Sequence, residues 1–129
     1  FFLFNFYKGF IFMIIPRTLY SLLFMINTQI THIHRSCMIN NKDWYVHQIN
    51  TSTNHGCDKM FNFIFSGGLN FQIEHHLFPS INHCHHPYIR PIVKKICKKY
   101  NVKYIEFNGY YDAFLSYYNY LTLIYKLKK

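Results

Sequence analysis

The stretch GGLNFQIEHHLFP, residues 67–79, places a glutamine and two adjacent histidines in an apolar setting. On a helix, Gln72 shares a face with both His75 and His76, because they follow it by three and four residues. An amide oxygen and two imidazole nitrogens would then converge, and imidazole is a good ligand for iron, zinc and copper. The mixed ligands favour redox iron over structural zinc. From spacing alone, a solvated histidine pair is the alternative.

The residues around this stretch predict a helix. Phe61, Ile64 and Phe65 recur at helical spacing, which indicates a helix over residues 60–77, and Pro79 closes it. The paired glycines at 67 and 68 permit another backbone to approach closely.

Residues 1–33 form the candidate membrane region. The run FFLFNFYKGFIFMII is followed by Pro16 and Arg17, and a second apolar run then becomes polar at Asn27. A membrane-spanning helix needs about 20 apolar residues, so we prefer two partial membrane helices joined near Pro16. One kinked helix whose polar end enters a protein interior is an alternative, as are two buried helices of a soluble protein.

Composition narrows the class of protein. Lys and Arg outnumber Asp and Glu by 14 to 5, with much of the excess after residue 88, which fits a cytosolic face near anionic lipid. Nucleic acid is disfavoured as a partner because the aromatic residues lie in apolar runs, apart from the basic ones. The four cysteines form no CxxC pair, so we read them as free thiols. Because the chain opens on Phe1, we expect a fragment.

The remaining segments predict further helices. Residues 34–59 are polar and read as surface, residues 89–100 as a short helix with Ile92, Val93 and Ile96 on one side, and VKYIEF as a short strand. Residues after 109 read as a final amphipathic helix. The predicted fold is mainly α: a truncated helical integral membrane protein, with partial membrane helices in 1–33 and a cytosolic helical cap in 34–129 that carries the histidines.

The histidine stretch resembles a motif of a known family. GGLNFQIEHHLFP is similar to the third histidine box of the membrane-bound fatty acid desaturases, in the front-end (delta-5, delta-6 and delta-8) group, where glutamine replaces the first histidine of HxxHH. Trp44, Gln48 and Asn54 stand ahead of it at the family's spacing, and HCHHPYIRPIVKKICKKYNVKY resembles the segment that follows the box. The resemblance covers about residues 20–117.

The resemblance implies an enzyme and a partial metal site. It implies an oxygen-dependent di-iron acyl desaturase, multi-pass in the endoplasmic reticulum membrane with box and C-terminus cytosolic. Its substrate would be an unsaturated acyl-CoA or acyl-phospholipid, and its electron donor cytochrome b5, whose domain we do not find here. The expected metal ligands are Gln72, His75, His76 and His32. The residues expected to orient them are Asn27, Gln29, Gln48 and Asn54, with capping or loop roles as the alternative for the last two.

Other residues receive lesser roles. Phe71 and Phe78 are candidates for the acyl channel, with core packing as the alternative. Glu74 is expected to point away from the ligand face into solvent or toward a lysine, and His47 and His55 are expected at the surface.

The chain also departs from the family pattern. The earlier boxes HxxxH and HxxHH are absent from its first 60 residues, so we expect this chain to be inactive alone. A sphingolipid long-chain-base desaturase shares the same box and is an alternative. A non-catalytic zinc-binding or membrane-associated module is a second alternative, in which the histidines hold one structural ion or none. Its zinc ligands would include the histidines at 83, 85 and 86 with Cys84 and Cys97.

Overall fold

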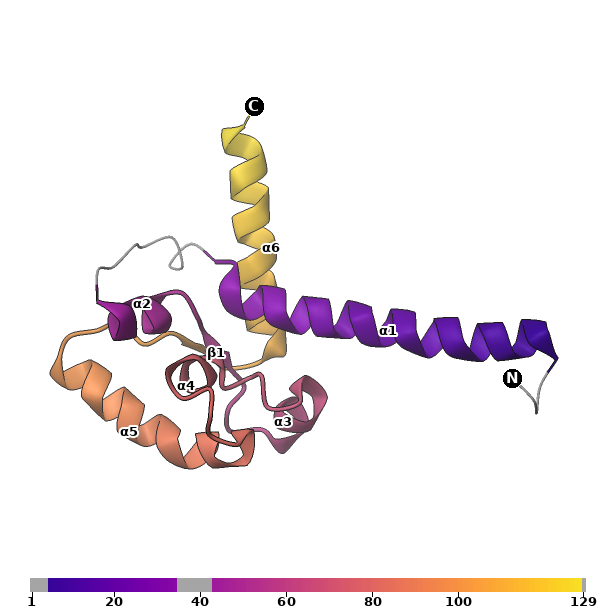
Figure 1. Cartoon of the computed structure of the whole chain (residues 1–129). Helices are drawn as coiled ribbons and strands as arrows, with labels where there is room; N and C mark the ends of the chain where they lie inside the picture. Colours follow the sequence, from indigo (N-terminus) through magenta and orange to yellow (C-terminus); the bar gives the residue numbers. More distant parts are fainter. Residues whose placement is uncertain (1–4, 35–42, 129) are drawn as a thin grey trace.

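The computed structural model describes residues 5–34 and 43–128, and its elements are nearly all helical. A long helix, α1, and a shorter one, α6, extend in different directions from a compact body (Figure 1). The elements are α1 (Phe6–His32), α2 (Trp44–Asn50), β1 (Asn54–His55), α3 (Met60–Ser66), α4 (Gln72–Leu77), η2 (His83–His85), α5 (His86–Lys99), β2 (Glu106–Phe107) and α6 (Tyr110–Leu127). The predicted strand is confirmed as the short β2, which pairs in parallel with β1.

Helix α1 passes through Pro16 without a break, so the preferred pair of partial membrane helices is wrong. Proline removes one backbone hydrogen bond, and the apolar side chains on both sides of it continue on one helix. Its 27 residues reach about 40 Å, more than the ~30 Å of a bilayer's hydrocarbon core. Among the described residues, α1 is the one helix long and apolar enough to cross a membrane. None of its most apolar window is buried, so the reading of buried soluble helices is wrong too.

The polar end of α1 enters the compact body. Asn27 and Thr31 are almost wholly buried there. The Thr31 carbonyl accepts a hydrogen bond from the Thr53 backbone N–H at 2.9 Å, which satisfies a carbonyl that the helix end leaves open. The alternative of a helix whose end carries polar groups into a protein interior therefore describes α1, which is otherwise exposed.

The predicted single helix over residues 60–77 is two helices. Gly67 and Gly68 both have positive φ values, 61° and 85°, and end α3. A Cβ on Gly68 would lie 2.9 Å from the ring of His83, so this position has no room for a side chain. The apolar face expected on α3 lies at the surface of the protein, where the side chains of Phe61 and Ile64 are more than 70% exposed. The turn separates α4 from α3, and α4 ends just before Pro79, as predicted.

The hydrophobic core joins α2, α4 and α5. Ile49, Ile73, Val93 and Cys97 form it. Helix α5 begins at His86 with proline in its first turn, so the amphipathic helix is confirmed. Of the three residues expected on its buried side only Val93 is buried, because α4 covers a narrower stripe than the sequence suggested.

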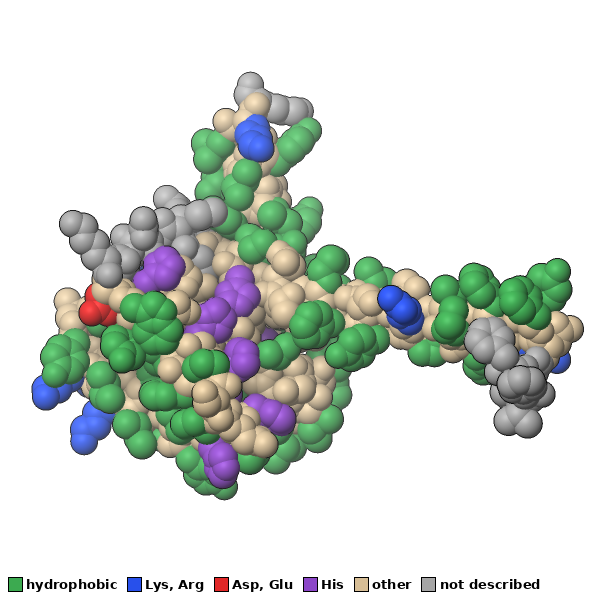
Figure 2. Space-filling view, in the orientation of Figure 1, with side chains coloured by type: hydrophobic (Ala, Val, Ile, Leu, Met, Phe, Trp, Pro, Cys, Tyr) green, Lys and Arg blue, Asp and Glu red, His purple; other side chains and the backbone are tan. Residues whose placement is uncertain are grey.

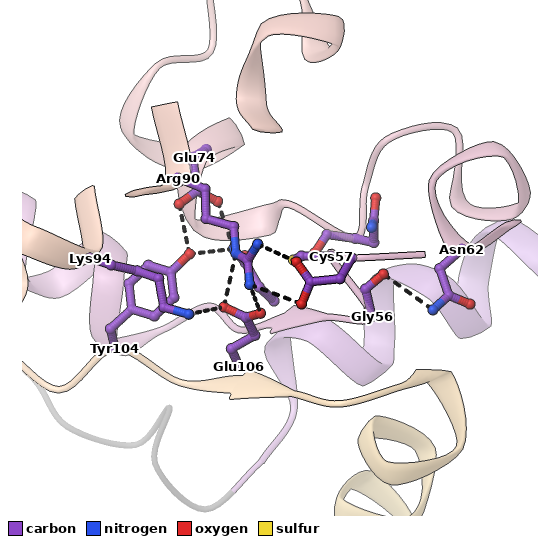
Figure 3. A network of polar contacts seen from close by, with 11 residues as sticks. Gly56, Cys57, Asn62, Glu74, Arg90, Lys94, Tyr104 and Glu106 are labelled. Atoms are coloured by element: carbon purple, nitrogen blue, oxygen red, sulfur yellow. Dashed lines mark hydrogen bonds and ion pairs between the residues drawn. The ribbon is translucent and has the colours of Figure 1, made fainter. Parts of the chain in front are cut away.

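A buried polar cluster fixes α4 against the strands. The Asn54 side chain accepts from the Ile73 backbone N–H at 2.9 Å and donates to Glu74 at 2.6 Å. The Tyr104 hydroxyl donates to the other Glu74 oxygen at 2.8 Å (Figure 3). Glu74 is fully buried, so the expectation of a solvated carboxylate is wrong. Burial raises the pKa of Glu74, against the lowering effect of its hydrogen bonds from Asn54 and Tyr104.

A second polar cluster lies nearer the surface. Arg90 of α5 forms ion pairs with Asp58 and Glu106, and Lys94 pairs with Glu106 at 2.8 Å (Figure 3). Burial alone would lower the pKa of Arg90, but the hydrogen bonds that it donates to Glu106 and Asp58 raise it overall. Lys94 therefore has a partner, whereas the sequence placed it on a solvated face. The cluster ties α5 to β2 and to the loop before α3.

His55, expected at the surface, is buried with its ring edge-on to Tyr110. Its backbone N–H donates to the Asn70 carbonyl at 3.1 Å. The strand that pairs with β2 carries the ring inward, and burial lowers the pKa of His55 to about 4. His47, also expected at the surface, is half-buried.

Asn54→Ala should destabilise the chain by about 2–3 kcal/mol, because it leaves the Ile73 N–H and a Glu74 oxygen buried without their partner. Chemical denaturation in detergent measures the effect. Asn119→Ala, on exposed α6, is the matched control and should change the free energy of unfolding by less than about 0.5 kcal/mol. Equal effects of the two variants would show that Asn54 does not hold α4.

The burial of His55 predicts a pH dependence of stability. Its folded pKa is lowered to about 4, so its stabilising contribution is complete above the unfolded value of about 6.5 and is lost as pH falls toward 4. His55→Phe should reduce the pH slope of the free energy of unfolding by about 1.4 kcal/mol per pH unit between these two pKa values. Unfolding curves at several pH values, with His85→Phe as an exposed control, measure the slope. Parallel profiles for the parent and His55→Phe would contradict the burial of a neutral ring.

Candidate functional site

The end of α1 and the start of α4 bring two histidines and a glutamine together. The rings of His32 and His76 lie 4.7 Å apart between centroids, and the Gln72 amide nitrogen lies 3.1 Å from His32 Nε2. Histidine side chains gather across this face of the compact body (Figure 2). Residues 40 or more positions apart in the sequence thus form one cluster, which we call the His32–Gln72–His76 cluster.

Hydrogen bonds set the tautomers of both histidines. The Thr51 backbone carbonyl can only accept, so His32 Nδ1–H donates to it, across 3.2 Å. Gln48 Oε1 likewise accepts from His76 Nδ1–H at 2.8 Å. Each ring therefore keeps an Nε2 lone pair, which is the arrangement that metal-binding histidines show.

The cluster favours the neutral form of the His76 ring and leaves one acceptor unused. Burial, with smaller contributions from His32 and His75, lowers the pKa of His76 to about 4. A ring that is neutral at pH 7 can bind a metal without first losing a proton. The Gln72 amide donates to His32, and its oxygen is buried with no hydrogen-bond partner among the described residues. Beside this oxygen lie the Nε2 lone pair of His76 and that of His32, which here accepts from the Gln72 amide, and this donor set fits part of an iron site.

His75 has its ring between those of His76 and His86. Its ring is 6.1 Å from that of His76 and 6.2 Å from that of His86, between centroids. His86 is fully buried. Of the four expected ligands, the structure brings His32, Gln72 and His76 into one cluster and sets His75 beside His86.

The four expected orienting residues have different positions. Gln48 contacts His76 directly, as described above. Asn54 forms hydrogen bonds with the first turn of α4 and contacts neither histidine of the cluster, which corresponds to the capping alternative. Asn27 is buried and donates to the Leu23 carbonyl of its own helix at 2.9 Å, and Gln29 is half-buried one turn before His32.

The two expected channel residues lie apart from the described grooves. Phe71 is buried with its ring edge-on to Phe63, which matches the core-packing alternative. Phe78 ends α4 and is 38% exposed. A groove of about 420 Å³ lies instead between α1 and α3, and reaches the buried end of α1 at Asn27. Its lining is Tyr20, Leu23, Phe24, Asn27, Ile64, Phe65, Ser66, Gly67 and Leu69.

The zinc cluster of the non-catalytic alternative is not assembled. Cys97 packs in the hydrophobic core, and Cys84 is exposed on η2. Within residues 5–34 and 43–128, no three His, Cys, Asp or Glu side chains form a group that could hold a metal. The His32–Gln72–His76 cluster has two such residues, with the glutamine amide as its third member. Cys57, Cys84 and Cys97 are free thiols, as predicted, and Cys37 lies outside the described residues.

Sequence reasoning missed the carbonyl of Thr51 and the role of Glu74. A backbone carbonyl leaves no signature in residue type, so Thr51 could not be found from the sequence. Glu74 lies between Gln72 and His75 and is three residues after a buried phenylalanine. The available signal was a short helix that is buried on several sides. It lies beside a tyrosine and an asparagine that can donate hydrogen bonds to a carboxylate.

Comparison with known proteins identifies the family of this chain. The chain matches the model of the fatty acid desaturase family over residues 1–108. It is 42% identical over 81 residues to an acyl-lipid (8-3)-desaturase of Dictyostelium discoideum. These 81 residues are 63% of this chain and 17% of that protein. It is 38% identical over 79 residues to the sn-1 linoleoyl-lipid 6-desaturase of a Synechocystis strain, 61% of this chain and 22% of that protein.

A third relative is a Delta(8)-fatty-acid desaturase of Helianthus annuus, 41% identical over 71 residues, or 55% of this chain and 15% of that protein. The chain thus covers 15% to 22% of the length of these three relatives. No solved structure matches it. The match over residues 1–108 includes α1 and the whole His32–Gln72–His76 cluster, and the chain belongs to the fatty acid desaturase family, with front-end desaturases among its relatives.

Proposed function

We propose that the chain supplies part of the iron site and part of the acyl site of a front-end desaturase, an oxygen-dependent enzyme that introduces a double bond into an unsaturated acyl chain. The observation that carries the proposal is the His32–Gln72–His76 cluster with both Nδ1–H groups held by acceptors. Surface histidines need no such support, whereas ligand histidines are usually fixed in this way.

The residues that would hold iron are His32 and His76 through Nε2 and Gln72 through its amide oxygen. His75 is added from the family's box, on the same helix as His76. Bound iron would supply the oxidation chemistry that side chains lack, because a methylene C–H bond resists any side-chain base. The protein's part is to keep the rings neutral, aim their lone pairs and exclude water. Gln48 and Thr51 do the aiming.

The groove between α1 and α3 is the proposed acyl site. Its lining is mainly apolar and aromatic, which suits a hydrocarbon chain, and Asn27 at its inner end lies on the same helix as His32. An acyl chain lying there would run along the surface of α1, where the lipid tails of a bilayer also lie. The acyl carrier is proposed to be coenzyme A or a phospholipid.

The remaining parts of the proposal follow the family. The cluster lies at the polar end of α1, which we place at the cytosolic face of the endoplasmic reticulum membrane in a multi-pass protein. Cytochrome b5 is the proposed electron donor. Two iron atoms need more ligands than one glutamine and three histidines provide, so we expect no desaturase activity from these 129 residues alone.

His76→Ala should lower the iron content of the purified protein by about tenfold or more, because it removes an Nε2 lone pair from the cluster. Elemental analysis after iron loading in detergent measures the metal directly. His85→Ala, on exposed η2, is the matched control and should keep the parent's iron content. Loss of iron in both variants, or in neither, would count against the cluster as the site.

Gln48→Leu should weaken iron binding by about 10- to 100-fold, since His76 loses the acceptor that sets its tautomer. Gln48→Glu keeps an acceptor oxygen at the same place and should restore most of the affinity. Competition with a coloured iron chelator gives both affinities. Unchanged binding by Gln48→Leu would mean that the hydrogen bond does not orient a ligand.

A further inference from the structure

Helix α6 carries an aromatic and apolar stripe along its whole length. The stripe recurs at steps of three and four residues, which places its members on one helix face. Its members are Tyr110, Phe114, Tyr117, Leu121 and Ile124. The opposite face carries the polar side chains Asp112, Ser116 and Asn119 at the same spacing, and the apolar Leu115 and Leu123 line a hollow together with them. The helix is therefore two-sided, although the protein covers little of its apolar side.

Only the first turns of α6 pack against the protein. Tyr110 and Phe114 line a shallow hollow together with Ile26 of α1, and Ala113 is fully buried. Further along, Tyr118 beside the stripe is 58% exposed and Leu121 within it is 40% exposed. The stripe therefore begins on α1 and continues beyond the contacts that the described residues make with it.

The direction of α6 relative to α1 identifies what covers it. Helix α6 leaves the polar end of α1 and runs across the direction of α1 rather than alongside it (Figure 1). Hydrophobic side chains cover both helices (Figure 2). If α1 crosses a bilayer, a helix that runs across it from the end lies along the membrane surface. The hollow shared by Ile26, Tyr110 and Phe114 makes the two apolar surfaces continuous.

The composition of α6 suits that location. Tyrosine is enriched where hydrocarbon meets headgroups, because its ring is apolar and its hydroxyl is polar. Lys126 and Lys128 follow at the end of the helix, and their long side chains can reach anionic headgroups. We propose that α6 lies flat on the bilayer as an interfacial helix, with its aromatic stripe among the headgroups and its lysines toward anionic lipid.

The inference rests on the proposed membrane position of α1, so its test includes a probe on each helix. Trp44 is the single tryptophan and is half-exposed, which makes Trp44→Phe a suitable background. Tryptophan is then placed on the stripe (Leu121→Trp), on the opposite face (Asn119→Trp) and in the middle of α1 (Leu19→Trp). Each protein is reconstituted in phosphatidylcholine and phosphatidylserine vesicles whose lipids carry bromine either near the headgroup or near the chain end.

Bromine near the headgroup should quench Leu121→Trp about twofold or more over Asn119→Trp, since an interfacial helix buries one face at the headgroup boundary. Bromine near the chain end should quench Leu19→Trp most strongly. Equal quenching at 119 and 121 with normal quenching of Leu19→Trp would overturn the inference and leave the position of α1 intact. Stronger quenching of Leu121→Trp by deep bromine would also overturn it, since α6 would then enter the bilayer core.

An unquenched Leu19→Trp would overturn both the membrane position of α1 and the inference. Tyr118→Trp is a conservative second probe beside the stripe and should behave like Leu121→Trp. Circular dichroism checks that each variant keeps the parent's helix content. Iron content should equal the parent's in every variant, because the probes lie outside the His32–Gln72–His76 cluster, so a failed iron site and a misplaced α6 give different results.

Discussion

The position of α4 depends on the buried side chain of Asn54. Its carbonyl oxygen accepts the N–H of Ile73 in the first turn of α4, and its amide group donates to Glu74 one residue further on. Helix α4 has only six residues, too few to be stable through its own hydrogen bonds. Contacts with Asn54 and Tyr104, together with the packing of Ile73 in the core, supply what the helix lacks. Because Gln72 and His76 lie on α4, this arrangement also sets their positions.

The His32–Gln72–His76 cluster exists because an apolar helix has a polar end. Helix α1 is lined with apolar side chains up to Met25, and its last turns then bury Asn27 and Thr31 inside the compact body. His32, at the final position, is thereby carried to α4 and hydrogen-bonded by Thr51. Thus one helix carries both the exposed apolar surface and His32, and the proposed acyl groove is lined by the same helix.

Much of this arrangement could be predicted from short-range patterns. The helices at 86–99 and 110–127, the stop before Pro79 and the family were readable, because each depends on residue type and spacing. Helix α1 was divided wrongly at Pro16, because a proline signals a break in water more strongly than in an apolar helix. The burial of Glu74 was missed because its partners Asn54 and Tyr104 lie 20 and 30 residues away, and that of His55 because its ring contacts Tyr110 of α6. Which histidine faces His32 is likewise a long-range property.

The described cysteines differ in burial and therefore in chemical reactivity. Burial raises the pKa of Cys57, and it raises that of Cys97 in the hydrophobic core, so both thiols hold their protons firmly. Cys84 is exposed on η2, between two histidines. An alkylating reagent therefore reaches Cys84 while the compact body is folded, and reaches Cys97 only once α4 and α5 separate. Among the described cysteines, Cys84 can thus be labelled at the surface, whereas labelling of Cys97 reports that the core has opened.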